Sequence, residues 1–510
     1  MKLDFIKNTK RNIIAGAVSR VIAMLFPFLN RTLFLWLMGP KYLGLNGLFT
    51  SILGVLMLAE LGFGTAVVCS MYKPIADDDR ELVCAYLNFY RTVYRWIGTA
   101  IFFGGLCLLP FLRDLVHGHM PPDVDLHILY LLHLVNTSAS YFLFAYRGAV
   151  ISAHQRHDVL TNIRTMTSVV QYLTVFLILA LTQNYYLYVI TTVLFTVIQN
   201  LLIVRESNRL FPDILPRGTL PPERRRKVLS DVKAIFLHKV GAVISYSIDN
   251  ILLSAFIGLD AVAAYGNYYY VYTTVAGIPA IIYSSMLGGF GNRIHTSSRE
   301  DNFKLVMRAC RLVGIIIIWC AAMMLALYQP FIKVWVGHKY TTLALHFLTP
   351  ALLVLYFYIN QSRQVLLTFK AAAGLWKEDQ WKPVVGGAVK LATGIGFILC
   401  LPSTYKLDGV ILSSIISYLL IQIPWESRVV FSAFFDREQA KVYWRNQAVT
   451  ALISLVACAA TLTAVHFIPL SGIVGLAADG IVAGVISSVL VMAIFRKDVR
   501  ELREKIFRKR

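Results

Sequence analysis

Charge is the scarcest property of this sequence. Only 15% of its 510 residues are Asp, Glu, Lys or Arg, 57% are hydrophobic, and the mean hydropathy is +0.63. A soluble domain averages about 25% charged residues. Apolar runs separated by short polar breaks cover nearly the whole chain. The composition therefore excludes an ordinary soluble domain and predicts an all-α polytopic membrane protein.

The sequence also lacks the motifs of catalytic and metal centres. Its seven cysteines include no CxxC pair and no cluster with histidine, which excludes a disulfide framework and a thiolate metal site. No P-loop, GxSxG, HExxH or paired-carboxylate cluster is present. We therefore expect no catalytic residues, no metal and no cofactor, and a protein that is not an enzyme. Transport would draw on the membrane potential, on consumption of the product or on an ion gradient, with Na+ or H+ left open as the coupling ion.

What is present is a series of about fourteen apolar runs, each long enough to cross a bilayer. Their approximate limits are 12–37, 45–71, 86–112, 126–151, 160–182, 185–204, 234–257, 261–287, 304–328, 343–369, 383–402, 408–430, 447–469 and 473–495. If the N-terminus is cytoplasmic, the connections on that side hold 31 basic residues and those on the other side hold 5. Because Lys and Arg collect in cytoplasmic loops, we expect both termini in the cytoplasm. The net charge of +21 lies largely in these loops and no nucleic-acid-binding module is present, so we expect no nucleic-acid partner.

The longest connection, residues 205–233, is rich in proline and carries the basic run ERRRK. We interpret it as a cytoplasmic linker that contacts anionic membrane lipids. It separates an N-terminal lobe of six spans (1–204) from a C-terminal lobe of six (234–433). The rest, residues 434–510, holds two further spans and a basic cytoplasmic tail. Because six is an even number, both lobes enter the membrane from the same side, which predicts two parallel repeats.

The two lobes share a pattern of glycines and basic residues. At an offset of 219 residues the matched pairs are Gly39 and Gly258, Gly47 and Gly266, Arg20 and Lys239, Asn30 and Asp249, and Arg31 and Asn250. At an offset of 216 the matched pairs are Arg95 and Arg311, Gly98 and Gly314, and Arg147 and Arg363. The pattern indicates a duplicated membrane unit with a basic residue at the same depth in each half.

Basic residues outnumber acidic ones inside the predicted spans, 13 to 4. An arginine at mid-membrane costs about 2.5–3.5 kcal/mol, so such residues normally face a bundle interior or a wet cavity. A surplus of cations favours an anionic cargo, and arginine suits phosphate because of its planar fork of donors. The candidate substrate-binding residues are Arg20, Arg31, Arg147, Lys239, Asn250 and Arg363. Six other intramembrane cations lie near cytoplasmic ends, where they can extend to the membrane surface: Arg91, Arg95, Arg308, Arg311, Lys370 and Arg428.

Two intramembrane acids and one group of tyrosines have more than one interpretation. Glu60 in the second run and Asp249 in the seventh either pair with an arginine or bind a coupling cation. Tyr265, Tyr268, Tyr269 and Tyr272 share one helix face. This face is either a glycan surface, since sugars pack on aromatic rings, or an interfacial aromatic belt.

One stretch resembles a known family. Residues 30–76 contain GPKYLGLNGLF, then AELGFG, then YKPIA, and this resembles the bacterial polysaccharide-biosynthesis (O-antigen and capsule) flippases. They belong to the multidrug/oligosaccharidyl-lipid/polysaccharide (MOP) exporter superfamily, with the multidrug and toxin extruders (MATE) and the lipid II flippase. The resemblance implies a MATE-like fold in a bacterial inner membrane and alternating access through a cationic cavity. The implied cargo is an oligosaccharide on undecaprenyl diphosphate, moved to the periplasmic leaflet, with a polysaccharide polymerase complex as a further partner.

Two other functions stay open at this point. A cation-coupled drug antiporter would need essential acids, but the first span has Asn30-Arg31 and no acid. A membrane-embedded polysaccharide polymerase or acyltransferase would need a cluster of His or Asp near one membrane face, and the sequence has none. The excess of bases favours the anion path.

Overall fold

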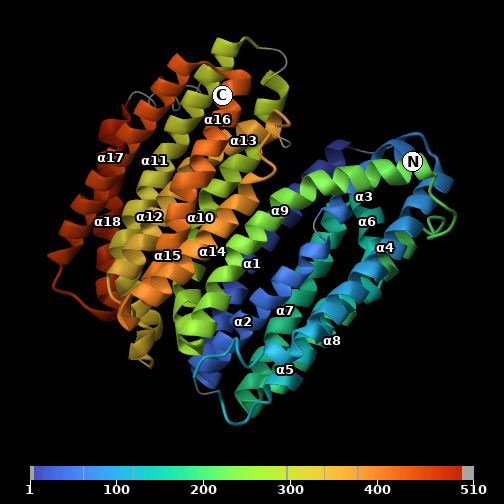
Figure 1. Ribbon diagram of the computed structural model, residues 1–510, viewed down its shortest axis with the longest axis horizontal. Helices are drawn as coiled ribbons and strands as arrows, with labels where there is room; N and C mark the ends of the chain where they lie inside the picture. The colour runs from blue at the N-terminus through green and yellow to red at the C-terminus, as the bar shows by residue number, and fades with distance from the viewer. Residues whose placement is uncertain are drawn as a thin grey trace. The chain divides into compact units, whose positions relative to one another are not determined.

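The computed structural model describes residues 5–60, 62–118, 120–294, 297–337, 339–375 and 378–496. The side chains of residues 5–18, 20–21, 59, 231, 233–246, 288 and 292 are also outside the description. Within these limits all regular structure is helical (Figure 1). This confirms the predicted all-α membrane fold.

The chain divides by its internal contacts into two compact units, residues 1–263 and 264–510. The first unit holds α1 (Phe5–Met38), α2 (Pro40–Leu56), η1 (Met57–Glu60), α3 (Phe63–Ala76), α4 (Arg80–Cys107), η2 (Leu109–Phe111), α5 (Leu126–Phe142), α6 (Tyr146–Ala153), α7 (His157–Thr182), α8 (Tyr185–Leu210) and α9 (Pro222–Phe256). The second unit holds most of α10 (Leu259–Ile294), then α11 (Arg299–Ile332), α12 (Leu348–Ser362), α13 (Gln364–Ala372), α14 (Lys382–Cys400), α15 (Lys406–Ser417), η6 (Tyr418–Gln422), α16 (Ile423–Phe434), α17 (Arg437–His466) and α18 (Gly472–Ile494). The lobe boundaries predicted at 204, 233 and 433 stay a prediction.

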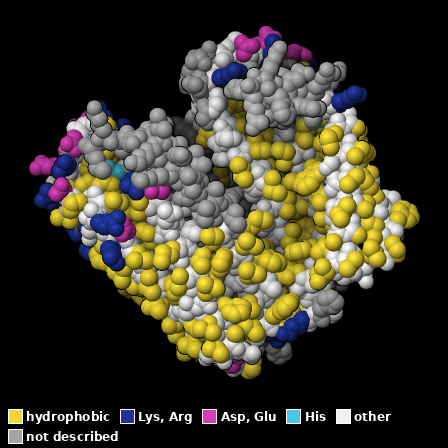
Figure 2. Space-filling model, turned by 180° about the vertical axis from the view of Figure 1, so that it is seen from behind, with side chains coloured by type: hydrophobic (Ala, Val, Ile, Leu, Met, Phe, Trp, Pro, Cys, Tyr) yellow, Lys and Arg dark blue, Asp and Glu magenta, His cyan; other side chains and the backbone are white. Residues whose placement is uncertain are grey.

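The described residues form ten helices long and apolar enough to cross a membrane, or eleven if the bent pair α5–α6 is one span. Each of the fourteen predicted runs is largely helical where it is described, but several are broken by turns. The count of fourteen crossings therefore stays a prediction. Large apolar side chains are exposed on the helix surfaces, such as Leu181 at 75% and Ile473 at 76%. Figure 2 shows hydrophobic side chains over most of the described surface of one face and charged side chains gathered mainly toward its margins, as expected for a multi-pass membrane protein.

Two glycines end the first helix of each sequence repeat at corresponding points. Gly39 separates α1 from α2 with a φ of 98°, and Gly258 separates α9 from α10 with a φ of 126°. A positive φ is costly for residues with a Cβ atom. Gly39 and Gly258 therefore have the same backbone role at the end of a helix. Gly44 in α2 is required for a different reason, because a Cβ there would lie 2.2 Å from the carbonyl oxygen of Leu259.

The repeated arginines also mark breaks. The helix that contains Arg147 is bent by 50° from the preceding helix α5. Arg363 lies between α12 and α13, which are separate helices. The two positions differ in degree: Arg147 follows a sharp bend, whereas Arg363 lies at a one-residue turn inside the membrane-length stretch Thr341–Ala372.

In the second unit, α11 is the central helix. It packs against α12, α17 and α18, and more than half of the residues in its most apolar stretch are buried. The two helices beyond the predicted duplication, α17 and α18, therefore cover one side of α11.

Candidate functional site

The first unit contains a polar group built around Glu60. The hydroxyl group of Tyr94 donates a hydrogen bond to Oε1 of Glu60, and that of Tyr141 donates one to Oε2. Glu60 ends η1 at the break between α2 and α3, whereas the tyrosines come from α4 and α5. Tyr90 packs edge-on against Tyr94 with ring centroids 4.3 Å apart. Two helices, α4 and α5, therefore hold the carboxylate that η1 supplies.

Small residues make room for this group. A Cβ on Gly98 would lie 2.7 Å from the Cβ of Tyr141, so the absence of a side chain lets α5 approach α4 closely. A Cβ on Gly64 would lie 2.7 Å from the hydroxyl of Tyr90. Gly98 is also one of the glycines matched between the sequence repeats. Its position here is explained by the packing of the tyrosine that binds Glu60.

The Glu60 group lines a cavity of about 690 Å³ that lies entirely within the first unit. We call it the Glu60 cavity, and its residues come mainly from η1 and from α3 to α8. Its polar and aromatic lining comprises Glu60, Thr65, Cys69, Tyr72, Tyr90, Tyr94, Asn136, Thr137, Ser140, Tyr141, Ser152, His157, Arg164 and Thr196. Glu60 is therefore accessible from a space large enough for a small ligand.

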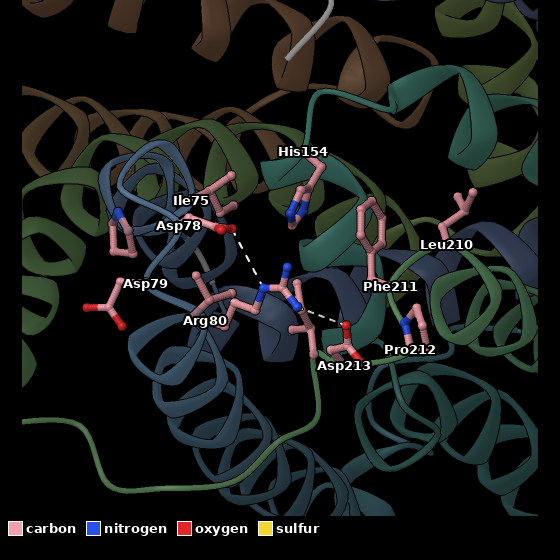
Figure 3. A pocket seen from close by; sticks show the side chains of 12 residues that line it. Ile75, Asp78, Asp79, Arg80, His154, Leu210, Phe211, Pro212 and Asp213 are labelled. Atoms are coloured by element: carbon pink, nitrogen blue, oxygen red, sulfur yellow. Dashed lines mark hydrogen bonds and ion pairs between the residues drawn. The ribbon is translucent and has the colours of Figure 1, made fainter. Parts of the chain in front are cut away.

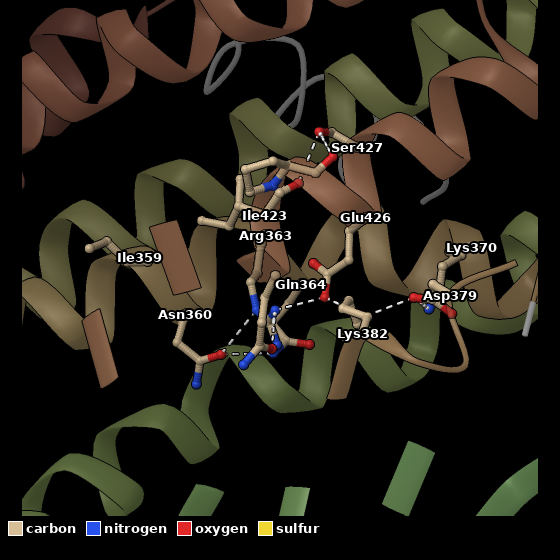
Figure 4. A network of polar contacts seen from close by, with 12 residues as sticks. Ile359, Asn360, Arg363, Gln364, Lys370, Asp379, Lys382, Ile423, Glu426 and Ser427 are labelled. Atoms are coloured by element: carbon tan, nitrogen blue, oxygen red, sulfur yellow. Dashed lines mark hydrogen bonds and ion pairs between the residues drawn. The ribbon is translucent and has the colours of Figure 1, made fainter. Parts of the chain in front are cut away.

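A buried chain of ion pairs occupies the second unit (Figure 4). Arg363 Nη1 lies 2.7 Å from Oε1 of Glu426, and Lys382 Nζ lies 2.6 Å from the same oxygen. Lys382 also lies 2.8 Å from Oδ2 of Asp379, which pairs in turn with Lys370. All five side chains are nearly inaccessible to solvent. We call these residues the Arg363 network.

The Arg363 network holds three cations and two carboxylates, so it keeps one positive charge. Arg363 also lies over the ring of Tyr418 at 4.3 Å, and donates to Gln422 at 3.0 Å. Asp379 lies in the connection between α13 and α14, outside the spans. Burial alone would raise the pKa of Asp379, but Lys382 and Lys370 outweigh burial and hold this pKa below its usual value. The connection is therefore fixed to α13, α14 and α16 by charge.

A third cluster attaches the start of the predicted linker to the first unit (Figure 3). Arg147 donates a hydrogen bond to the carbonyl oxygen of Ile214 at 2.7 Å. Arg80 lies 3.0 Å from Asp213. The His154 ring stacks on Phe211 with centroids 4.1 Å apart. Three linker residues, Phe211, Asp213 and Ile214, are thus held against the start of α4 and the two ends of α6.

The structure places the predicted site residues in different surroundings. Arg20 and Lys239 lie on α1 and α9, but their side chains fall outside the described part. Arg31 is half-buried and lies 3.5 Å from the carbonyl oxygen of Ala263. Asp249 and Asn250 are buried in α9, and Asn250 donates to Ser51 of α2 at 2.8 Å. Their assignment to substrate or ion binding stays a prediction.

The other three predicted residues have defined partners. Arg147 binds the linker backbone and Arg363 binds Glu426, so neither guanidinium is isolated. Glu60 bonds to two tyrosines, and no arginine whose side chain is described pairs with it.

Two tyrosines of the predicted aromatic face, Tyr268 and Tyr272, are buried, and Tyr268 stacks on Tyr328 inside the second unit. They belong to its packed core.

Sequence reasoning missed the residues that surround these groups. It did not single out Tyr94, Tyr141 or Asn136, which lie in apolar runs as common helix residues. It also missed Asp379, because this acid lies in a connection. A usable signal was the close spacing of charges of both signs, since Lys370, Asp379 and Lys382 all lie in one short segment.

The comparisons identify the family. The model of the polysaccharide biosynthesis protein family matches residues 9–287, more than half of the 510-residue chain. The chain therefore belongs to the polysaccharide biosynthesis protein family, as the motifs in residues 30–76 predicted. A search of curated proteins gives no match.

Solved structures define the fold class. The chain is similar to the lipid II flippase MurJ in an inward closed conformation, with a TM-score of 0.66 and 13% identity over 96% of this chain and 99% of that chain. It is also similar to an inward-facing multidrug resistance MATE family transporter of the MOP superfamily, with a TM-score of 0.54 and 16% identity over 82% and 98%. A MATE structure in the bent conformation gives 0.52 and 12% over 83% and 95%. The fold is thus similar to that of MurJ and the MATE transporters, in a multi-pass membrane protein.

Proposed function

We propose that this protein is a flippase for lipid-linked oligosaccharide. It moves undecaprenyl-diphosphate-linked glycan from the cytoplasmic to the periplasmic leaflet of a bacterial inner membrane, for surface polysaccharide such as O-antigen, with both termini in the cytoplasm. The observation that carries the proposal is the family match over residues 9–287. The MOP fold supports it, because MurJ, the similar structure with a TM-score of 0.66, is a lipid II flippase.

The charge distribution supports an anionic cargo. The predicted spans hold 13 basic and 4 acidic residues, and the two diphosphate charges of such a lipid need cationic partners. Arg20 and Lys239 occupy matched positions in the two sequence repeats. Under this proposal they contact the diphosphate during alternating access. Anionic lipids bind the basic linker, and a polysaccharide polymerase receives the product.

Glu60 is the proposed site of a coupling H+ or Na+. Both carboxylate oxygens accept a tyrosine hydroxyl, and the group opens to a cavity. In the part of the chain that the structure describes, no group of three or more His, Cys, Asp or Glu side chains is arranged to hold a metal ion. The rival function, a cation-coupled drug antiporter, predicts that Glu60→Gln abolishes activity while charge removal at Arg20 and Lys239 does not.

The experiment that tests the function is a leaflet assay in proteoliposomes. The vesicles contain undecaprenyl-diphosphate glycan on the inside, and an impermeant lectin reports its arrival on the outside. The wild type is compared with Arg20→Ala/Lys239→Ala at equal reconstitution. The matched control is Arg91→Ala, because Arg91 donates to Asn88 on its own helix at 2.7 Å.

We expect movement in the wild type and in Arg91→Ala and a strong loss in the double variant. Absence of movement under every imposed gradient would reject the lipid-linked glycan as the cargo. Movement that is equal in all three proteins would keep the flippase and reject Arg20 and Lys239 as cargo contacts.

A further inference from the structure

We propose that the Glu60 cavity is a carbohydrate-binding site, which holds a sugar ring of the cargo apart from its diphosphate. This inference rests on the proposed function, and it assigns the glycan to the first unit alone. The size of the cavity, about 690 Å³, lies inside the range of small-molecule sites. Most of its polar lining is uncharged, which suits a ligand with many hydroxyl groups.

Asn136 offers the clearest free donors in this cavity. Its Oδ1 accepts a hydrogen bond from Thr196 at 2.7 Å, which fixes the orientation of the amide. The amide nitrogen has no hydrogen-bond partner among the residues described. A carboxamide carries two N–H donors, so both are available to ligand hydroxyls or carbonyls. The neighbouring Ser140 accepts from Asn200 at 3.4 Å and keeps its own hydrogen to donate.

Thr65 and the tyrosine rings complete a surface with two kinds of contact. Thr65 is exposed, and within the described structure its hydroxyl makes no hydrogen bond. Tyr72 is 41% exposed and lines the same cavity. A sugar ring has hydroxyl groups at its edge and C–H groups on its faces, and an aromatic ring provides an apolar face beside a polar tip. Adjacent hydroxyl and aromatic groups therefore match a sugar better than they match a flat apolar drug.

Glu60 keeps open hydrogen-bond acceptor positions beside its two bonds to tyrosine hydroxyls. Each carboxyl oxygen has two lone pairs, and the two tyrosine hydroxyls occupy one position on each oxygen. Ligand hydroxyls can donate to a position that the tyrosines leave open. Two tyrosines also fix the carboxylate in place, which lowers the entropic cost of binding.

Arg164 explains how a lipid-linked sugar would be oriented. It lies on α7 seven residues after His157, near the end of the helix that faces the cytoplasm under the proposed orientation. Its side chain is exposed and forms no ion pair with any described residue. A sugar attached to a diphosphate carries negative charge on one side. Arg164 therefore favours a pose with the phosphate end toward the cytoplasm and the ring toward Asn136 and Glu60.

Cys69 provides a reporter that needs no transport. This free thiol is exposed and lines the cavity. Cys107 is also free and exposed but is not part of the cavity lining, so it serves as the internal control. The measurement is the rate of maleimide labelling of each cysteine in the full-length purified protein, read by peptide mass spectrometry. The two probes are undecaprenyl-diphosphate glycan extracted from the cells that contain the protein, and undecaprenyl diphosphate without sugar.

We expect the glycan lipid to slow labelling of Cys69 by about tenfold, which corresponds to about 1.4 kcal/mol, and to leave Cys107 unchanged. The lipid without sugar should slow labelling of Cys69 much less, because it has a diphosphate for Arg164 but no ring for Asn136 and Glu60, and it should leave Cys107 unchanged. Glu60→Gln and Asn136→Ala should remove the protection. Thr65→Val should weaken it, and this variant is the safeguard against misfolding because Thr65 has no partner in the described structure.

Equal protection by both lipids, or no protection by either, would overturn the carbohydrate site. Protection that persists in all three variants would overturn it as well. The leaflet assay tests the proposed function independently of the sugar site. If the glycan lipid protects Cys69 but never changes leaflet in the proteoliposome assay, the sugar site stands and the flippase proposal is rejected.

Discussion

Arg363 and Glu426 form a direct buried ion pair, with Nη1 of Arg363 2.7 Å from Oε1 of Glu426. The residue matched to Arg363 in the first repeat is Arg147, which has no carboxylate in this role and donates to the carbonyl oxygen of Ile214 instead. Both arginines lie next to a helix boundary, Arg147 near the start of α6 and Arg363 between α12 and α13. The duplicated arginines therefore share a position but have different partners, one acidic and one in the backbone.

The Glu426 carboxylate should be the most sensitive member of the Arg363 network. Glu426→Gln leaves Arg363 and Lys382 without their shared acid, and removing one partner of a buried pair costs about 3–5 kcal/mol. We expect a marked fall in the unfolding temperature, measured by circular dichroism in detergent. Arg363→Ala should cost less, because Lys382 still pairs with Glu426 at 2.6 Å.

The control is Glu438→Gln, which removes an acid 2.7 Å from Lys441 on an exposed part of α17. Exposed pairs contribute little, about 0–1 kcal/mol, so its unfolding temperature should stay near that of the wild type. Equal losses in Glu426→Gln and Glu438→Gln would contradict a structural role for the buried network.

Arg147→Ala should release the start of the linker. Its hydrogen bond to Ile214 at 2.7 Å is buried, and a hydrogen bond to a charged group contributes about 1.5–3 kcal/mol. We expect amide hydrogen exchange in residues 211–214 to rise by about tenfold or more. Arg164→Ala, on the nearby helix α7, should leave this exchange unchanged. The same exchange in wild type and Arg147→Ala would show that the contact does not hold the linker.

Stability of the first unit should fall in mild acid because of His154. Burial lowers the pKa of His154, and its hydrogen bond to the Val150 carbonyl opposes this only in part. The folded pKa thus lies below the unfolded value of about 6.5. The stabilisation is present above pH of about 6.5 and is lost as pH falls through the folded pKa.

Unfolding temperatures between neutral pH and about pH 5 measure this effect. His154→Phe keeps a ring against Phe211 and should flatten the pH dependence. His466→Phe, at an exposed position on α17, should keep the wild-type slope. A wild-type slope in His154→Phe would exclude His154 as the source.

Gly98→Ala should disturb the tyrosines around Glu60. The new Cβ would lie 2.7 Å from the Cβ of Tyr141, where α5 cannot move without shifting its backbone. Overpacking of this kind costs about 1–3 kcal/mol. Gly104→Ala on the same helix meets its nearest atom at 3.6 Å, so it should be tolerated. We expect a lower unfolding temperature and faster labelling of Cys69 in Gly98→Ala alone; equal behaviour of the two variants would contradict the packing argument.

The sequence by itself was sufficient for the membrane class, the helical architecture and the family. Hydropathy is a local property, so the apolar runs predicted largely helical segments, although several of these segments are broken by turns. The offset of 219 residues also identified Gly39 and Gly258, whose positive φ angles depend on the backbone and not on distant neighbours. The family motifs lie within residues 30–76 for the same reason, since a motif is read along the chain.

Only the tertiary structure decided which charged and polar groups meet. Glu60 accepts from Tyr94 and Tyr141, which are 34 and 81 residues away, and Arg363 pairs with an acid 63 residues later. These distances depend on how closely helices pack, as at Gly98, and on where spans break. Helical periodicity gives the face on which a side chain lies, but it does not give the helix opposite that face. The partners of an intramembrane charge are therefore set by three-dimensional packing.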